Sequence, residues 1–168
     1  MHSFIYLPRY RIVVCKECKF GVVANAINAH LRGEKHKDVS KKERRRIVAE
    51  ITQIPGVIKE ESELKDLPFP PPTSEAIPEL EHPQDDGMRC NMCPYISRQR
   101  QGIQEHCRSA HGWENKQGKG RPRFTERQEG QDVPWVPNVR CQQFFKTRLK
   151  SGWFKVKRGR GEEREDKS

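Results

Sequence analysis

The sequence predicts a small α+β fold: two separated zinc-finger (ββα-like) units, a helix, an extended acidic Pro-rich linker and a C-terminal two-stranded segment. Two observations support this prediction. Cysteine and histidine pairs with metal-ligand spacing occur twice along the 168 residues, and only 33% of the residues are hydrophobic while another 33% are charged. Because such a chain holds too little apolar material for one large core, small metal-stabilised units are favoured.

Each cluster reads Cys-x2-Cys, a gap of 11 or 12 residues, and then His-x5-His or His-x4-His. The Cys-x2-Cys turn places two thiolates on one side of a knuckle, and a following helix presents two imidazoles, so four ligands can converge tetrahedrally. The first gap is one residue shorter than the second. The predicted ligands of two structural Zn²⁺ ions are Cys15, Cys18, His30 and His36 in the first cluster, and Cys90, Cys93, His106 and His111 in the second.

The first predicted finger covers residues 11–38 and the helix after it residues 39–54. A short apolar strand over 11–14 leads into the knuckle, and a helix over 24–32 carries Ile27 one turn before the first histidine. The second helix has a basic face. Three interpretations of this face stay open: it is solvated, it lies along phosphates, or it serves as a nuclear-localisation patch. The residues of that face are Lys41, Lys42, Arg44, Arg45 and Arg46.

Residues 55–87 form the predicted linker. Residues 55–88 hold 9 Asp or Glu against 2 Lys or Arg, whereas residues 1–54 hold 5 against 12 and residues 89–168 hold 9 against 19. Acidic residues and repeated prolines disfavour a regular helix and favour extended chain, so a solvated spacer is the simplest prediction. Those prolines are Pro68, Pro70, Pro71, Pro72, Pro78 and Pro83.

The second predicted finger covers residues 88–113, followed by a Gly/Arg-rich loop and two strands within 114–156 and a charged, disordered tail over 157–168. The strands are expected at residues 139–145 and 153–156. Cys141 lies in the first of them without a local histidine, so it is expected to be a small buried residue. Cys107 follows His106 directly and is expected to point away from the metal.

A tandem DNA-reading array is disfavoured. Counting from the expected helix starts, the three base-contacting positions of the first finger are Val23, Ala26 and Ala29, whose side chains cannot form hydrogen bonds. A spacer of 53 residues, from 37 to 89, separates the fingers. The second finger offers Gln99, Gly102 and Glu105 at the three positions, and its candidate nucleic-acid contacts are Gln99, Arg100 and Gln101.

Several motifs in order carry a family resemblance: Val14-Cys-Lys-Glu-Cys-Lys, Ile77-Pro-Glu-Leu80, Cys93-Pro-Tyr95, Val139-Arg-Cys-Gln142 and Trp153-Phe-Lys-Val156. The chain resembles the fungal family named after orsellinic acid biosynthesis cluster protein D. The resemblance implies a Cys2His2-finger protein in which residues 12–156 form one module. The first cluster's His-x5-His spacing is also similar to matrin-like fingers, which are associated with RNA or structured nucleic acid.

We therefore expect a structural zinc-binding protein that is nucleic-acid-associated with low sequence specificity, or a regulatory binding protein. The alternative is a zinc-stabilised protein–protein interaction module without nucleic-acid binding, motivated by the apolar helix positions of the first finger and the aromatic C-terminal segment. An enzyme is not expected, since both clusters offer four side-chain ligands and no catalytic motif is present. We expect neither a membrane partner nor a small-molecule substrate. The expected location is intracellular, in the nucleus.

Overall fold

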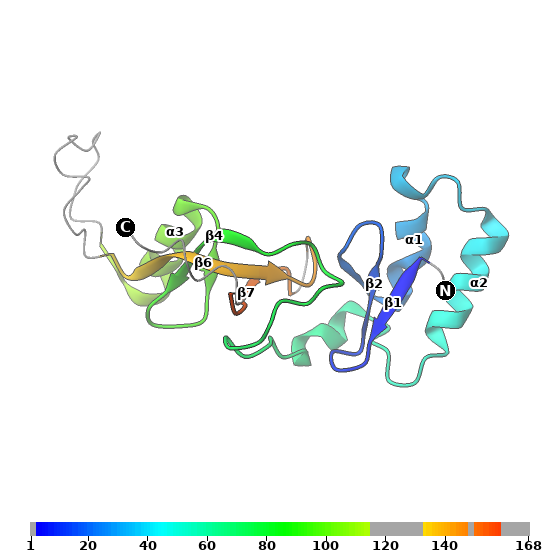
Figure 1. Ribbon diagram of the computed structural model, residues 1–168, viewed down its shortest axis with the longest axis horizontal. Coiled ribbons are helices and arrows are strands. Elements are labelled where there is room, and N and C mark those ends of the chain that lie inside the picture. The colour runs from blue at the N-terminus through cyan, green and yellow to red at the C-terminus, as the bar shows by residue number, and fades with distance from the viewer. Residues whose placement is uncertain (1–2, 115–132, 148–149, 159–168) are drawn as a thin grey trace.

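The computed structural model describes residues 3–114, 133–147 and 150–158, which form two antiparallel sheets and several short helices. The strand order is β1-β2-β3 in the first sheet and β5-β4-β6-β7 in the second. Figure 1 shows α1 and α2 at one end of an elongated molecule and α3 near the other. The predicted small α+β fold class is confirmed. The predicted Gly/Arg loop at 118–123 and the tail beyond residue 158 lie outside the described residues.

The first sheet contains β1 (Phe4–Leu7), β2 (Ile12–Cys15) and β3 (Gly21–Val22). All four residues of β2 are buried, and three of them are β-branched, which suits a strand covered on both faces. The register pairs Phe4 with Cys15, so β1 supports the end of β2 that carries the first candidate ligand. The sequence analysis did not predict β1.

The predicted helices of this region are present with small shifts at their ends. A 3₁₀ turn η1 (Ala24–Ala26) runs into α1 (Ile27–Leu31), and a second 3₁₀ turn η2 (Glu34–His36) follows. Helix α2 (Lys41–Thr52) begins at Ser40, whose hydroxyl accepts a hydrogen bond from the Glu43 amide at 3.1 Å. Ile27, Leu31, Ile47 and Ile51 from α1 and α2 share one core with the first sheet.

The second sheet contains β4 (Gln84–Cys90), β5 (Ile96–Ser97), β6 (Trp135–Gln143) and β7 (Trp153–Lys155). The two predicted C-terminal strands are present, but they are not a separate two-stranded segment: β6 pairs with β4 along its length. Gly87 permits this pairing, because a Cβ there would lie 2.7 Å from the Val139 carbonyl oxygen. Helix α3 (Arg100–His111) packs beside β4 and β5 and ends at Gly112, which has a left-handed φ of 65°.

The prediction of a solvated linker is wrong, because residues 57–80 supply buried side chains to a central core. The short helix η3 (Glu61–Asp66) lies within this segment, and its acidic side chains Glu63 and Asp66 are exposed. Proline removes backbone donors but does not prevent burial, so an acidic, proline-rich chain can still pack through regularly interspersed aliphatic residues. The buried aliphatic residues are Val57, Ile58, Leu64, Leu67, Ile77 and Leu80.

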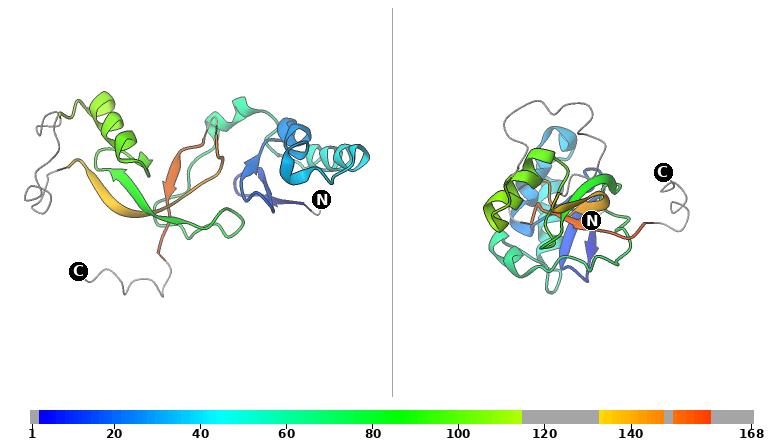
Figure 2. Two further views of the ribbon diagram at one scale, coloured as in Figure 1. Left: turned by 90° about the horizontal axis from the view of Figure 1, so that it is seen from above. Right: turned by 90° about the vertical axis from the view of Figure 1, so that its left-hand side faces the viewer.

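The same core joins the two ends of the molecule, which are therefore not separate units. It combines residues of the first sheet, such as Ile12 and Val14, with Phe144, which follows β6, and Phe154 of β7. Gln142, 2% exposed, reinforces this join through its side-chain amide. Its Oε1 accepts from the Ile77 amide at 2.8 Å, and its Nε2 donates to the carbonyls of Ile77 and Glu81 at 3.0 Å each. Figure 2 shows the backbone of η3 and β7 between the two ends.

Within the described residues, no helix combines the length and the apolar character that crossing a membrane requires.

Candidate metal centres and basic groove

The first candidate metal centre lies where the first sheet meets α1. Cys15 ends β2, Cys18 lies in the turn after it, His30 lies on α1 and His36 ends η2. The turn needs a left-handed residue, Lys19 with φ 61°, and it closes through a 2.7 Å bond from the Lys19 amide to the Cys15 carbonyl. One ligand atom from each of the four side chains lies within 4.8 Å of the others.

The donor set of this centre fits a tetrahedral metal ion. His36 Nε2 lies 3.6 Å from Cys15 Sγ and 3.4 Å from Cys18 Sγ, close to the separation of about 3.5 Å that sulfur and nitrogen ligands have around one Zn²⁺. His30 Nε2 is buried and has no hydrogen-bond partner among the protein atoms. Burial, followed by the nearby His36, lowers the pKa of His30, which favours the neutral imidazole that a metal requires.

Glu17 supports the first centre from outside its ligand set, and the sequence analysis missed it. The Glu17 carboxylate lies 3.2 Å from Nδ1 of His36, the nitrogen that does not face the cluster. A carboxylate on the second ring nitrogen fixes the tautomer and increases the basicity of a histidine ligand. Its position between the two cysteines of the knuckle is the only signal that the sequence carries for this role.

The second candidate metal centre is built from β4, the turn before β5, and α3. Cys90 ends β4, Cys93 lies in the turn, and His106 and His111 both lie on α3. The four ligand atoms again lie within 4.8 Å of one another, and Cys93 Sγ is 3.0 Å from His106 Nε2. His111 Nε2 is buried without a hydrogen-bond partner among the protein atoms, so this set fits a metal ion as well.

Aromatic packing holds the second centre. The ring of Tyr95 stacks on His106 with 3.9 Å between ring centroids and 9° between the planes. Trp113 and Trp135 meet edge to face beside the buried residues Cys90 and Ile103. The stacked ring fixes the orientation of the His106 imidazole much as Glu17 fixes that of His36.

The two remaining cysteines lie outside both ligand sets. Cys107 is fully buried beside the second centre, and burial raises its thiol pKa to about 11. Cys141 is fully buried in β6, where burial raises its thiol pKa to about 12. A thiol with such a pKa is almost wholly protonated at neutral pH and is a poor nucleophile.

A basic groove of about 840 Å³ lies between α1 and α2. No Asp or Glu lines it, so its side chains create a positive potential. Of the five predicted basic residues, Lys41, Arg44 and Arg45 line the groove, whereas Arg46 pairs with Glu43 and Glu50, and Lys42 is exposed elsewhere. Arg32 completes the groove lining, and the sequence analysis missed it because the residue follows α1 rather than belonging to α2.

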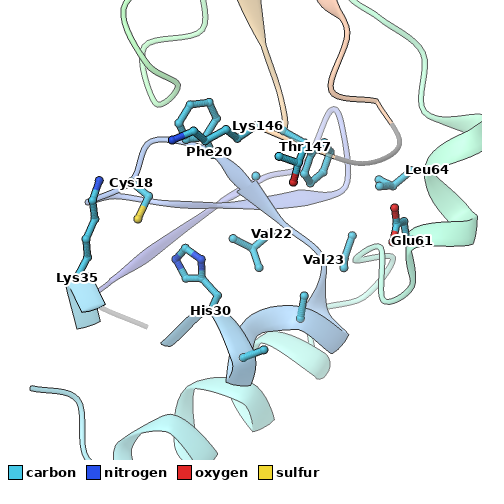
Figure 3. A pocket seen from close by; sticks show the side chains of 14 residues that line it. Cys18, Phe20, Val22, Val23, His30, Lys35, Glu61, Leu64, Lys146 and Thr147 are labelled. Atoms are coloured by element: carbon cyan, nitrogen blue, oxygen red, sulfur yellow. The ribbon is translucent and has the colours of Figure 1, made fainter. Parts of the chain in front are cut away.

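The candidate contacts of the second finger lie far from this groove. Gln99 precedes α3, and Arg100 and Gln101 open it; all three are exposed. Figure 1 places this helix and α2 near opposite ends of the molecule. The three apolar positions of the first finger instead line a pocket on the other side of α1, shown in Figure 3.

These features define a small α+β protein with two Cys/His clusters that can hold metal ions. The chain belongs to the family described as Orsellinic acid/F9775 biosynthesis cluster protein D (OrsD), whose model matches residues 2–112 and so includes both clusters. Residues beyond 112 lie outside that match, so the resemblance around Cys141 and Gln142 stays a prediction.

A relative from Emericella nidulans (strain FGSC A4), called Orsellinic acid/F9775 biosynthesis cluster protein D, is 30% identical over 113 residues, covering 64% of this chain and 20% of the relative. The chain therefore spans about a fifth of the length of that protein. No solved structure matches the chain.

Proposed function

We propose that this chain is a structural zinc-binding protein with two Cys2His2 fingers of the ββα type, and that it binds nucleic acid through the phosphate backbone with little sequence reading. The strand–strand–helix order around each cluster supports the finger assignment: β2, β3 and α1 in the first, and β4, β5 and α3 in the second. Zinc would hold the two strands to the helix in each finger.

The observation that carries the nucleic-acid proposal is the basic groove between α1 and α2. Arg32, Lys41 and Arg45 are exposed in it, and Arg44 is half-buried with one Nη donating to the Val39 carbonyl at 3.0 Å. Guanidinium and ammonium groups without acidic neighbours suit phosphate oxygens, which give affinity and no sequence information. The basic helix α2 also supports a nuclear location.

The chemistry of the two centres supports binding rather than catalysis. Four side-chain ligands complete a tetrahedral site and leave no position for a substrate or an activated water. Cys141, the cysteine without a histidine partner in the sequence, is buried and has a raised pKa. Both observations support a protein that is not an enzyme.

Zinc stoichiometry, coupled to a salt titration of binding to 20-nucleotide single-stranded DNA, duplex DNA and RNA, tests this function. We expect two zinc ions per chain and an affinity that falls linearly with salt on logarithmic axes. Two zinc ions without salt-dependent binding would refute the proposal and favour the alternative, a protein–protein interaction module that does not bind nucleic acid. Fewer than two zinc ions per chain would mean that at least one of the two clusters is not a metal site.

Charge-matched variants locate the binding surface. The double variant Arg32→Gln/Arg45→Gln removes two groove charges, and Lys42→Gln/Arg46→Gln removes two charges of α2 outside the groove. The groove variant should weaken nucleic-acid binding and reduce the slope of log affinity against log salt concentration by up to about 2. The Lys42→Gln/Arg46→Gln control should change this slope less. Equal effects of the two variants would contradict a groove-centred site.

A further inference from the structure

A second concave site lies on the opposite side of α1 from the basic groove. It has a volume of about 520 Å³ and is bounded by the first finger, η3 and the end of β6. Asn28 and Arg32 of the α1 region face the basic groove, whereas Ala26, Ala29 and His30 face this pocket. The two sites therefore present different chemistry from one helical segment.

The wall of the pocket is mostly apolar. Val22, Leu64 and Phe145 are buried behind it, and Val23 and Phe20 are half-buried at its surface. Ala26 and Ala29 have short side chains, so the backbone of a ligand can approach α1 closely at those two positions. In Figure 3 the side chains of Val22, Val23 and Leu64 lie around this space. Such a surface accepts aliphatic side chains from a partner.

The charged side chains of the pocket are distributed unevenly. Lys35 and Lys146 are exposed on the side of Cys18 and Phe20, and the Lys146 ammonium lies 5.9 Å from the Phe20 ring centroid. The acidic residue Glu61 lies beside Leu64, and Figure 3 shows it across the pocket from Lys35. A ligand that fits this distribution carries a carboxylate at one end of an apolar segment.

We propose that this pocket is a docking site for an extended segment of a protein partner, in which an aliphatic side chain adjoins an acidic residue. The aliphatic side chain packs on Val23, Ala26 and Ala29, and the carboxylate pairs with Lys35 and Lys146. Ala29, Lys146 and Thr147 are exposed at the pocket, so its lining is accessible to a peptide segment. This site goes beyond the nucleic-acid function and does not rest on it.

The first metal centre shapes this docking site. His30 and Cys18, two of its candidate ligands, form part of the pocket lining, and Lys35 directly precedes a third. Loss of the metal would release these walls from one another. We therefore expect peptide binding to be lost when a chelator removes the metal from the full chain, and to return when zinc is restored.

Three fluorescent peptides of equal length test the ligand chemistry by polarisation with the zinc-loaded protein. Their central sequences are Asp-Leu-Leu, Lys-Leu-Leu and Asp-Ser-Ser between Gly-Ser flanks, so that the charged residue stands at one end only, as the position of Glu61 requires. We expect the first to bind at least about tenfold more tightly than either control, since it alone supplies both the apolar and the acidic group. Equal binding of the first and either control, or binding of none, would overturn the proposal.

Ala29→Glu tests the location, with Asn25→Glu as a matched control. Both residues are exposed, but only Ala29 lines the pocket. The Ala29 variant should weaken binding of the Asp-Leu-Leu peptide at least about tenfold through steric filling and repulsion of its acid, whereas the Asn25 variant should change that binding less than about twofold. Zinc stoichiometry and circular dichroism verify that both variants fold. Unchanged binding by folded Ala29→Glu would also overturn the proposal.

Discussion

The two metal centres share one type of ligand set but differ in what surrounds it. The first lies against a core of ten buried residues, the candidate ligand Cys15 among them, which come from the first sheet, η1, α1, α2 and Val57. Among the described residues, the second adjoins a core of four buried residues, Cys90, Ile103, Cys107 and Trp135, of which Cys90 is itself a candidate ligand. The second centre therefore has less apolar burial to hold its helix when the metal is absent.

The largest expected effect is an asymmetric response to losing one metal. A structural zinc site contributes about 10–16 kcal/mol, more than a core of four residues can replace. Cys93→Ser should therefore abolish amide protection throughout α3. Cys18→Ser should disorder the knuckle but leave slow exchange in α1 and α2, whose Ile27, Leu31, Ile47 and Ile51 are buried in one core with the first sheet.

Hydrogen exchange measured residue by residue checks this difference. Zinc content, which should fall from two ions to one in each variant, is the control that each substitution removed only its own site. Equal loss of protection in α2 and α3 would show that the larger core does not stabilise the first region independently of the metal.

The next largest effect should come from the contact that joins the two regions. Gln142→Ala removes the Gln142 partner of the Ile77 amide and of the Glu81 carbonyl, and one of the two donors to the Ile77 carbonyl, which keeps its bond from the Leu80 amide at 3.2 Å. Because the Gln142 side chain is buried, we expect a loss of about 2–4 kcal/mol in the free energy of unfolding. Urea unfolding of the zinc-loaded chain measures it.

Gln143→Ala provides the control for that experiment. Within the part of the chain that the structure describes, Gln143 makes one side-chain bond, to the Ser151 carbonyl at 2.9 Å, and it is only half-buried. Gln143→Ala should lower the free energy of unfolding by no more than about 1 kcal/mol. A Gln142 variant as stable as the Gln143 variant would contradict the assignment of Gln142 as the joining residue.

A smaller effect should distinguish the supports of the two centres. Glu17→Ala removes the carboxylate at Nδ1 of His36 and should weaken zinc binding at the first site about 10- to 100-fold, with no change at the second. Competition with a chromophoric chelator, in chains carrying one intact site each, measures both affinities. Glu34→Ala, an exposed acid paired with Lys37, is the matched control and should have little effect.

The sequence predicted features that depend on local spacing. The four-residue knuckles and the histidine positions follow from neighbouring residues, and the structure brings each set of four side chains together. Helix α2 was predictable from its periodicity and from Pro55-Gly56 after it. Strands β6 and β7 were predictable from their run of apolar and aromatic residues.

The features that the sequence did not reveal depend on contacts between distant residues. Strand β6 reaches β4 across more than 40 residues, and no local pattern encodes the pairing of Val139 with Gly87. The average composition of residues 55–87 concealed Ile58 and Leu64, because burial depends on the partners that surround single residues. Glu17 and Arg32 likewise gain their roles only when the folded chain places them beside His36 and α2.

The smallest expected effect concerns the ion pair between Arg98 and Asp86 in the second region. Arg98 donates two hydrogen bonds to Asp86, at 2.6 and 3.0 Å, and stacks over Trp153 at 5.2 Å. The hydrogen bond from Arg98 lowers the pKa of Asp86 below its usual value of 3.8, so its stabilising effect is present above that pH and is lost as the pH falls through the lowered value.

Asp86→Asn should therefore lower the free energy of unfolding at pH 7, but by only about 0.2–1 kcal/mol, because both side chains are largely exposed. The difference should shrink in 1 M salt, which screens exposed charges. Glu105→Gln, which breaks the exposed pair with Arg108 at 3.0 Å, is the control for an ordinary helix-surface pair. A larger loss for Asp86→Asn than for Glu105→Gln, measured by urea unfolding of the zinc-loaded chain, would show that this pair helps to hold β4 to β5 and so adds to the limited apolar support of the second centre.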